Sequence, residues 1–223
     1  LVFGLCQNAL YLGLNFVAMQ TVQASLAAII ASTMPLLVAL AGWIVFGSKV
    51  RPLGVAGLIA GVFGVTLIMG ARLSGGTDIF GLLLLIIGVI SLTVATLAVM
   101  GASSGGNVLA IVGMQLLVGA ALLAVPAVLF EPFVVDWNAE LILAFFYTTL
   151  VPGLAATWVW FLLVGRIGAV RASTFHFLNP FLGVLIAAGF LGESIGPLDV
   201  VGVVVIAAGI LAVQLSKQVP QEK

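Results

Sequence analysis

Long apolar runs, separated by short breaks rich in charged, Gly, Pro or Asn residues, are the main pattern along this chain. Each run approaches the length of about 20 residues with which a helix crosses a bilayer. The pattern therefore predicts an all-α, polytopic membrane helix bundle with eight transmembrane helices joined by short connections. Their expected ranges are 1–19, 24–47, 53–71, 79–102, 107–130, 141–164, 172–192 and 198–216.

Composition strengthens this prediction and narrows the set of partners. Of the 223 residues, 63% are hydrophobic and only 6% are charged, too few to cover the surface of a soluble domain. The formal net charge of +0 argues against a nucleic-acid partner. Cys6 is the only cysteine, so the chain can form no internal disulfide or cysteine metal site. We expect the lipid bilayer as a partner, and no cofactor or metal.

Charged residues divide between the two predicted sides of the membrane. Eight spans place both termini on one side, which carries the bases Lys49, Arg51, Arg166, Arg171 and Lys217. The other side carries Arg72 and six acids, of which all but the first are expected to be solvated near the loops: Asp78, Glu131, Asp136, Glu140, Glu193 and Asp199. Because Lys and Arg mark the cytoplasmic side, we expect a multi-pass protein of the cell (inner) membrane with both ends cytoplasmic.

An internal repeat relates the first part of the chain to the last. The two parts align without a gap when shifted by 145 residues, the offset between Pro35 and Pro180. The same shift places Gly47 on Gly192, Pro52–Leu53 on Pro197–Leu198, Gly57 on Gly202 and Gly64 on Gly209. In so apolar a composition, prolines and glycines in register are far more informative than matched leucines or alanines.

The repeat also predicts how its two copies are oriented. The first three spans match the last three, which lie five helices further on, and an odd shift reverses the direction of each helix. Such inverted-topology copies, related by a two-fold axis in the membrane plane, are typical of alternating-access transporters. The second copy, 78–217, has five helices before a polar tail at 218–223, whereas the first, 1–72, has three. We therefore expect two helices before Leu1, and a parent protein of five plus five.

Several segments resemble EamA-type members of the drug/metabolite transporter superfamily. The second half reads SxxxxLNP, LGES and PLDVVGVVVIAAGI, and the first reads SLAAIIASTMP, FGSK and PLGVAGLIAGVFGV. Similar segments are GRIGAVRAS at 165–173, FYTTLVPGLAATWVWF at 146–161 and NALYLGLNFVAM at 8–19. The chain departs from the family at Ser48, where a glutamate is usual, and at Leu92 and Ala95, where aromatic residues are common.

The resemblance implies a ten-helix parent bundle with both termini in the cytoplasm. It further implies transport of small organic solutes, such as amino acids or related metabolites, often in the outward direction. We therefore expect a transporter and not an enzyme, with a small-molecule solute as its ligand.

Polar residues inside the apolar runs are candidate solute-binding residues. His176 and Asn179 lie three apart on one helical face, and Pro180 frees the carbonyl of residue 176 from its helical partner. Polar groups at membrane depth suggest a functional site by default, although hydrogen bonding that only packs helices is the alternative. Ser91 is a further candidate, although serines in apolar helices commonly bond to their own backbone.

The first span and its copy supply the remaining candidates. Asn8, Tyr11 and Asn15 share one face of the first span. The repeat maps this face onto the later copy, which adds Thr149 and Trp160 as residues expected to face the same central cavity.

Two other functions remain open at this point. GASSG at 101–105 matches G-x-S-x-G, and His176 is present, so an intramembrane serine hydrolase is one alternative. However, the nucleophile elbow needs a strand-to-helix turn, and no Asp or Glu lies in the middle of a span to orient the histidine. The other alternative is a non-transporting membrane protein.

The third predicted span carries a run of small residues: Gly54, Gly57, Gly61 and Gly64. Small residues allow close contact between helices. We expect them to pack against another helix of the same subunit, with a homodimer face as the lesser alternative.

Overall fold

The chain forms a bundle of helices in the computed structural model, which describes residues 1–47, 50–74, 76–100, 108–131, 134–167 and 175–218. No β-strand occurs in these ranges. Five helical segments are long and apolar enough to cross a membrane: Ala24–Val45, Pro52–Ala71, Ile79–Ala98, Val112–Phe130 and Pro197–Ser216. The predicted all-α membrane bundle is thereby confirmed.

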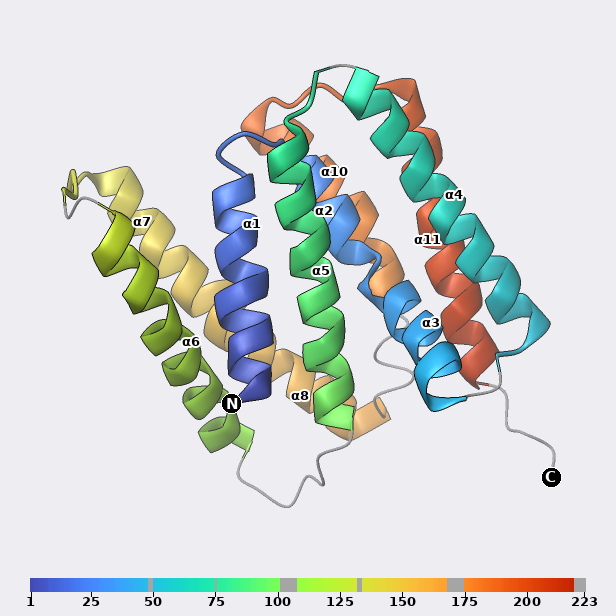
Figure 1. The fold of residues 1–223 in the computed structure, drawn as a ribbon, viewed down its shortest axis with the longest axis horizontal. Coiled ribbons are helices and arrows are strands. Elements are labelled where there is room, and N and C mark those ends of the chain that lie inside the picture. Colours follow the sequence, from blue (N-terminus) through green and yellow to red (C-terminus); the bar gives the residue numbers. More distant parts are fainter. Residues whose placement is uncertain (48–49, 75, 101–107, 132–133, 168–174, 219–223) are drawn as a thin grey trace.

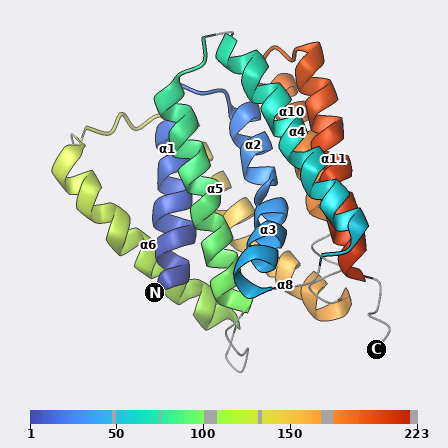
Figure 2. The same ribbon diagram turned by 45° about the vertical axis from the view of Figure 1, so that its right-hand side comes forward.

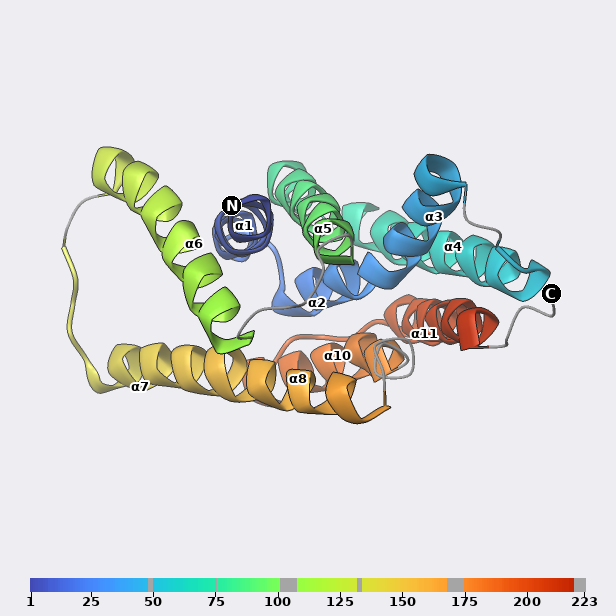
Figure 3. The same ribbon diagram turned by 90° about the horizontal axis from the view of Figure 1, so that it is seen from below.

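The five long segments correspond to predicted spans. Helices α2 (Ala24–Ser32) and α3 (Met34–Phe46) together make the first of them. The other four are single helices: α4 (Pro52–Ser74), α5 (Ile79–Met100), α6 (Val108–Phe130) and α11 (Pro197–Gln218). Figures 1 and 2 show α4 and α11 side by side, and Figure 3 shows α1, α5 and α4 in one row facing α8, α10 and α11, with α2 between the rows.

The other three predicted spans consist of shorter pieces that follow one another. The first span is a π-helix, η1 (Gly4–Leu12), followed by α1 (Gly13–Ala18). The sixth is α7 (Ala139–Thr148), a π-helix η2 (Thr149–Ala155) and α8 (Ala156–Ile167). The seventh is a 3₁₀ turn, η3 (Phe175–Leu178), and α10 (Asn179–Leu191), with 168–174 outside the described residues. Apolar periodicity alone does not reveal such interruptions, because the apolar run continues through them.

Proline and glycine determine the ends of several helices. Helices α3 and α10 each contain 13 residues, with proline in the first turn. Each ends at a left-handed glycine, Gly47 with φ 62° and Gly192 with φ 66°, which a side chain would disfavour. Helices α4 and α11 both begin with proline, whose fixed φ and missing N–H suit the first helical position.

Helix α2 lies at the centre of the apolar core. Its Leu26 and Ile29 are each only 1% exposed. They belong to one cluster with buried residues of α4, α5, α10 and α11, including Ile68, Leu85, Val184, Ile206 and Ile210. Since lipid is as apolar as leucine, packing and not exclusion from water stabilises such contacts within a membrane.

Glycines bring the backbones of α4 and α11 into contact. A Cβ built on Gly57 would lie 2.6 Å from the Gly209 carbonyl oxygen, and one on Gly64 would lie 3.0 Å from the Gly202 oxygen. As one residue number rises the other falls, so the two helices run antiparallel. Small residues allow this approach and the dispersion contacts that come with it.

The two ends of the bundle differ in charge. The loops at 19–23, 76–78 and 192–196 lie together at one end, at the top of Figure 1. We call this end, which carries Asp78, Glu193 and Asp199, the acidic end. Leu1 and the last turn of α11 lie at the opposite end, where α4 begins directly after Arg51.

We predict that Gly209→Ala destabilises the protein by roughly 1–3 kcal/mol, because the added methyl group overpacks the contact with Gly57. Gly70→Ala on the exposed part of α4 is the matched control, since its Cβ meets nothing within 4 Å. There, alanine should be neutral or stabilising by up to about 1 kcal/mol. Thermal unfolding in detergent measures both, and equal shifts in Tm would contradict a close α4–α11 contact.

Candidate solute-binding cavity

A cavity of about 260 Å³ lies between the helices, where two apolar helices are interrupted by proline. The α2–α3 segment contributes one wall, and η3 with α10 contributes another. Helices η1 and α5 complete it. The lining residues are Tyr11, Ala28, Ala31, Ser32, Met34, Pro35, Leu92, His176 and Asn179.

The prolines explain why the cavity occurs at this position. A proline lacks an N–H and clashes with the carbonyl four residues earlier. Pro35 acts in this way on Ala31, and Pro180 on His176, and both of these earlier residues line the cavity. The backbone tightens locally at each break: the Thr33 N–H bonds to the Ile30 oxygen at 3.1 Å, and residues 175–178 form a 3₁₀ turn.

His176 and Asn179 form the polar pair on one wall of the cavity. Nδ2 of Asn179 lies 3.2 Å from Nδ1 of His176. Because an amide NH₂ group can only donate, Nδ1 accepts, and a neutral ring then carries its proton on Nε2. The structure thus places three of the predicted site residues, Tyr11, His176 and Asn179, around one cavity.

The lining is mainly apolar and carries few hydrogen-bonding groups. Besides the His176–Asn179 pair, Tyr11 and Ser32 contribute hydroxyl groups, and the Ser32 hydroxyl donates to the Ile29 carbonyl at 2.6 Å. No Asp, Glu, Lys or Arg is among the described lining residues. An apolar hollow with a few convergent polar groups is the usual form of a small-molecule site, and this one lies just below the common range of about 300–1,000 Å³.

Asn8 and Asn15 lie apart from the cavity lining and contact neighbouring helices. The Asn8 amide donates to the Gln115 carbonyl of α6 at 3.0 Å, and its side chain faces Gly119. The Asn15 amide donates to the Tyr11 carbonyl at 2.7 Å and faces Gly88 of α5. These buried amides pack η1 and α1 between α5 and α6, so their role in solute binding stays a prediction.

The other predicted site residues are also outside the lining. The Ser91 hydroxyl donates to the Ile87 carbonyl of its own helix at 2.9 Å. Thr149 lies in η2 and is exposed. Trp160 lies in α8, with its side chain outside the described part of the structure. For all three, solute binding stays a prediction.

Most lining residues of the α2–α3 wall were not among the predicted site residues. Met34 and Ala31 line the cavity, and the 145-residue shift maps them onto Asn179 and His176. Applying the repeat to the second-half polar pair could therefore have identified both positions. Leu92 was noted only as a departure from an aromatic residue.

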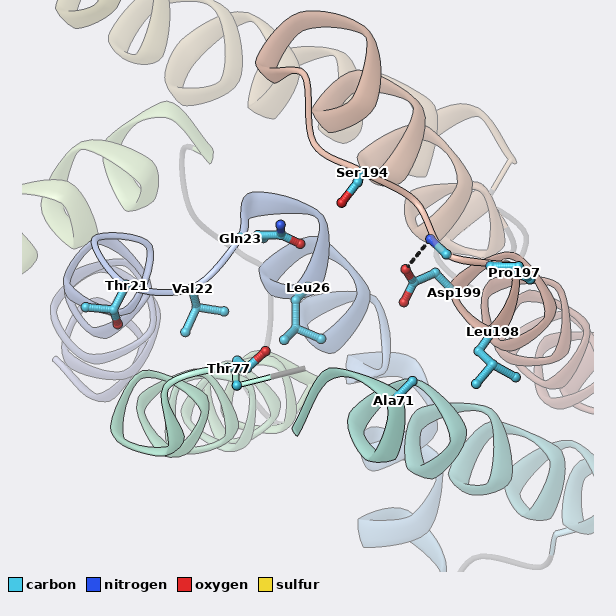
Figure 4. A pocket seen from close by; sticks show the side chains of 12 residues that line it. Thr21, Val22, Gln23, Leu26, Ala71, Thr77, Ser194, Pro197, Leu198 and Asp199 are labelled. Carbon is cyan, nitrogen blue, oxygen red and sulfur yellow. Dashed lines mark hydrogen bonds between the residues drawn. The ribbon is translucent and has the colours of Figure 1, made fainter. Parts of the chain in front are cut away.

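A second hollow of about 520 Å³ opens at the acidic end and is shown in Figure 4. Thr21, Val22 and Leu26 line it from one side, and Ser194 and Asp199 from the other. Contrary to the expectation of a solvated acid, Asp199 is only 5% exposed, and its carboxylate accepts from the Gly196 N–H at 2.8 Å.

Asp78 lies near this hollow, just before α5. Its carboxylate accepts from the Thr21 hydroxyl at 2.7 Å and from the Gly81 N–H at 3.0 Å. The Thr21 hydrogen bond, followed by that of Gly81, holds the pKa of Asp78 below its ordinary value. This carboxylate therefore stays anionic at neutral pH and ties the α1–α2 loop to the start of α5.

Broken apolar helices around a small cavity that carries a few polar groups are typical of multi-pass membrane transporters. The family model described as the EamA-like transporter family matches residues 1–70 and 79–215. The chain belongs to this family, as its motifs indicated.

Relatives of known sequence agree with this assignment. The chain is 26% identical over 215 residues to "Uncharacterized transporter YvbV" of Bacillus subtilis (strain 168), covering 96% of this chain and 70% of that protein. It is 26% identical over 205 residues to "Uncharacterized inner membrane transporter YedA" of Escherichia coli (strain K12), covering 89% of this chain and 64% of that protein. A solved structure titled "Crystal structure of protein" shares the fold, with a TM-score of 0.66 at 23% identity over 96% of this chain and 76% of that one.

We predict that Asn8→Ala lowers the free energy of unfolding by about 1 kcal/mol, because it removes a hydrogen bond between helices. Thr66→Ala is the matched control, since the exposed Thr66 hydroxyl bonds only within α4, to the Val62 carbonyl. Thermal unfolding in detergent compares them, and equal Tm values would contradict a packing role for Asn8.

Proposed function

We propose that this protein is a carrier that moves small organic solutes of no net charge, such as amino acids or related metabolites, outward across the cell (inner) membrane. The observation that carries the proposal is the cavity at the two proline breaks, with Tyr11, His176 and Asn179 in its lining. Carriers built from repeats bind their substrates where discontinuous helices meet near the midplane of the bilayer.

Matching helix bounds support the inverted repeat on which alternating access depends. Helix α3 begins at Met34 and α10 at Asn179, and both pairs of ends are 145 residues apart. The π-helices η1 and η2 begin at Gly4 and Thr149, again at the same offset. Wide π turns are frequent at functional sites, so their recurrence at matching positions favours a shared role.

The contact between α4 and α11 supports the same two-fold relationship. The repeat maps Gly57 onto Gly202 and Gly64 onto Gly209. The two close contacts, Gly57 with Gly209 and Gly64 with Gly202, are therefore exchanged into each other by the repeat. A two-fold interface has this property. A rocking motion about this glycine contact would open the cavity to each side in turn.

The chemistry of the cavity supports the proposed class of solute. A lining with no described carboxylate, ammonium or guanidinium group favours a ligand without net charge. The amide and imidazole can bind its polar end, while Ala28, Met34 and Leu92 accommodate an apolar part. The small volume favours a metabolite over a larger compound.

The charge difference between the two ends of the bundle supports the proposed orientation of the protein in the membrane. Asp78, Glu193 and Asp199 mark the acidic end, whereas Arg51 precedes α4 and Arg166 lies in the last turn of α8, both towards the other end. Since bases are retained on the cytoplasmic side, the acidic end faces outward and the termini face the cytoplasm.

We predict that His176→Ala and Asn179→Ala each reduce solute flux by about tenfold or more, because each removes a polar contact worth roughly 1–3 kcal/mol at a desolvated site. The assay is efflux of a panel of amino acids and related metabolites from cells producing the full-length protein. Thr66→Ala, on the exposed side of α4, should retain flux.

Ser103→Ala tests the hydrolase alternative in the same cells. Ser103 lies outside the described residues, and a carrier should be unaffected by its loss. Flux that survives both cavity substitutions would contradict the proposed site. Loss of a hydrolytic activity on Ser103→Ala would contradict the proposed function as a whole.

A further inference from the structure

The loop between α10 and α11 reaches the N-terminus of α2. The Glu193 carboxylate accepts from the Ala24 N–H at 2.7 Å through Oε1 and from the Ser25 N–H at 3.0 Å through Oε2. The first N–H groups of a helix have no partner within it and carry partial positive charge, so a carboxylate suits them. Gln23, at the N-cap position, makes no side-chain capping bond. Glu193 therefore caps α2 from the other half of the chain.

Below this cap, α2 and α10 remain in contact as far as the cavity. Val184 and Ala187 of α10 are 6% and 2% exposed. At Gly183, one turn from Ala187, an added Cβ would collide with the Cβ of Ala28, which lines the cavity. Beyond this point, Ser32 after the first turns of α2 and Asn179 at the start of α10 line the cavity. The α2–α10 contact thus closes the side of the cavity that faces the acidic end.

Only a short stretch of α2 separates the central cavity from the hollow at the acidic end. Leu26 lines the acidic-end hollow shown in Figure 4, and Ala28, two residues later on the same helix, lines the central cavity. At 1.5 Å of rise per residue, about 3 Å along α2, little more than half a turn, separate these two lining residues. The side chains of Val22, Leu26 and Ile29 are 4%, 1% and 1% exposed, so the barrier is apolar and closely packed.

We propose that Glu193 is a latch that holds the acidic-end entrance of the cavity closed. Opening that entrance separates α10 from the first turns of α2, which breaks both hydrogen bonds of the carboxylate. The latch therefore favours the state in which the cavity is closed towards the acidic end. This inference rests on the proposed carrier function, because it assigns the closed state to one half of a transport cycle.

The repeat does not reproduce the Glu193 carboxylate in the first copy. The repeat maps Glu193 onto Ser48, which carries no carboxylate and lies outside the described residues. The two states of the cycle should therefore differ in stability, and removal of the Glu193 carboxylate should reduce that difference.

The test measures how readily a cysteine in the cavity reacts with a membrane-impermeant maleimide. Ser32→Cys is the reporter, in a Cys6→Ser background that removes the chain's only cysteine. Labelling is followed in intact cells, which expose the outer face, and in inside-out vesicles, with the full-length protein in its membrane. In the Glu193→Ala background, the labelling rate from the acidic-end side should rise about tenfold, as expected for a shifted two-state equilibrium.

The variants provide graded and matched controls. Glu193→Gln keeps one acceptor oxygen without the charge, so its labelling rate should lie between those of the Glu193→Ala and parent proteins. Ser25→Ala should label like the parent, because the latch uses the Ser25 backbone N–H and the Ser25 hydroxyl has no hydrogen-bond partner among the described residues. If Glu193→Ala does not fold, Glu193→Gln carries the test.

Unchanged labelling in the Glu193 variants would overturn the latch. So would an equal rise from both sides of the membrane, because that result indicates general loosening of the bundle. Labelling requires no transported solute, so the latch can fail while efflux persists. Conversely, the labelling rate could rise from the acidic-end side alone in a protein that transports no solute. That result would support the latch and contradict the proposed carrier function.

Discussion

Backbone polar groups at membrane depth must find partners within the protein or in a water-filled cavity, and this constraint dominates the structure. Pro35 and Pro180 each remove an N–H from an apolar helix and disturb the carbonyl four residues earlier. The two breaks lie on opposite walls of one cavity. Each break is therefore tolerated where it borders the cavity, and the same arrangement brings His176 and Asn179 together in the cavity lining.

Two helix–helix contacts in the bundle, α4 with α11 and α2 with α10, differ in how they are made. Glycines bring α4 and α11 together backbone to backbone, with no side chains to rearrange. In contrast, α2 and α10 are joined at the acidic end by one carboxylate and by small apolar side chains. The α4–α11 contact suits a pivot, because its backbones are in close contact. The α2–α10 contact suits an entrance, because two hydrogen bonds are broken and remade more easily than such a backbone contact.

Sequence reasoning was most successful where residue type alone determines structure. Apolar runs predicted the long helices, and Gly47 and Gly192 end α3 and α10 as left-handed glycines. Side-chain contacts were harder to predict. Asn8 and Asn15 face α6 and α5, and a shared helical face in the sequence does not show which neighbouring helix each side chain contacts. Glu193 was expected to be solvated, because its role depends on a contact 169 residues away in the chain.

We propose that one cavity between two broken helices holds the solute and is reached from the two sides of the membrane in turn. Ala31→Cys, one turn before Met34 on the α2–α3 wall, reports on this directly. A transported solute should slow its reaction with an impermeant thiol reagent, and the reagent should reach it from either face of the membrane. Labelling that the solute does not affect, or that occurs from neither face, would contradict the claim.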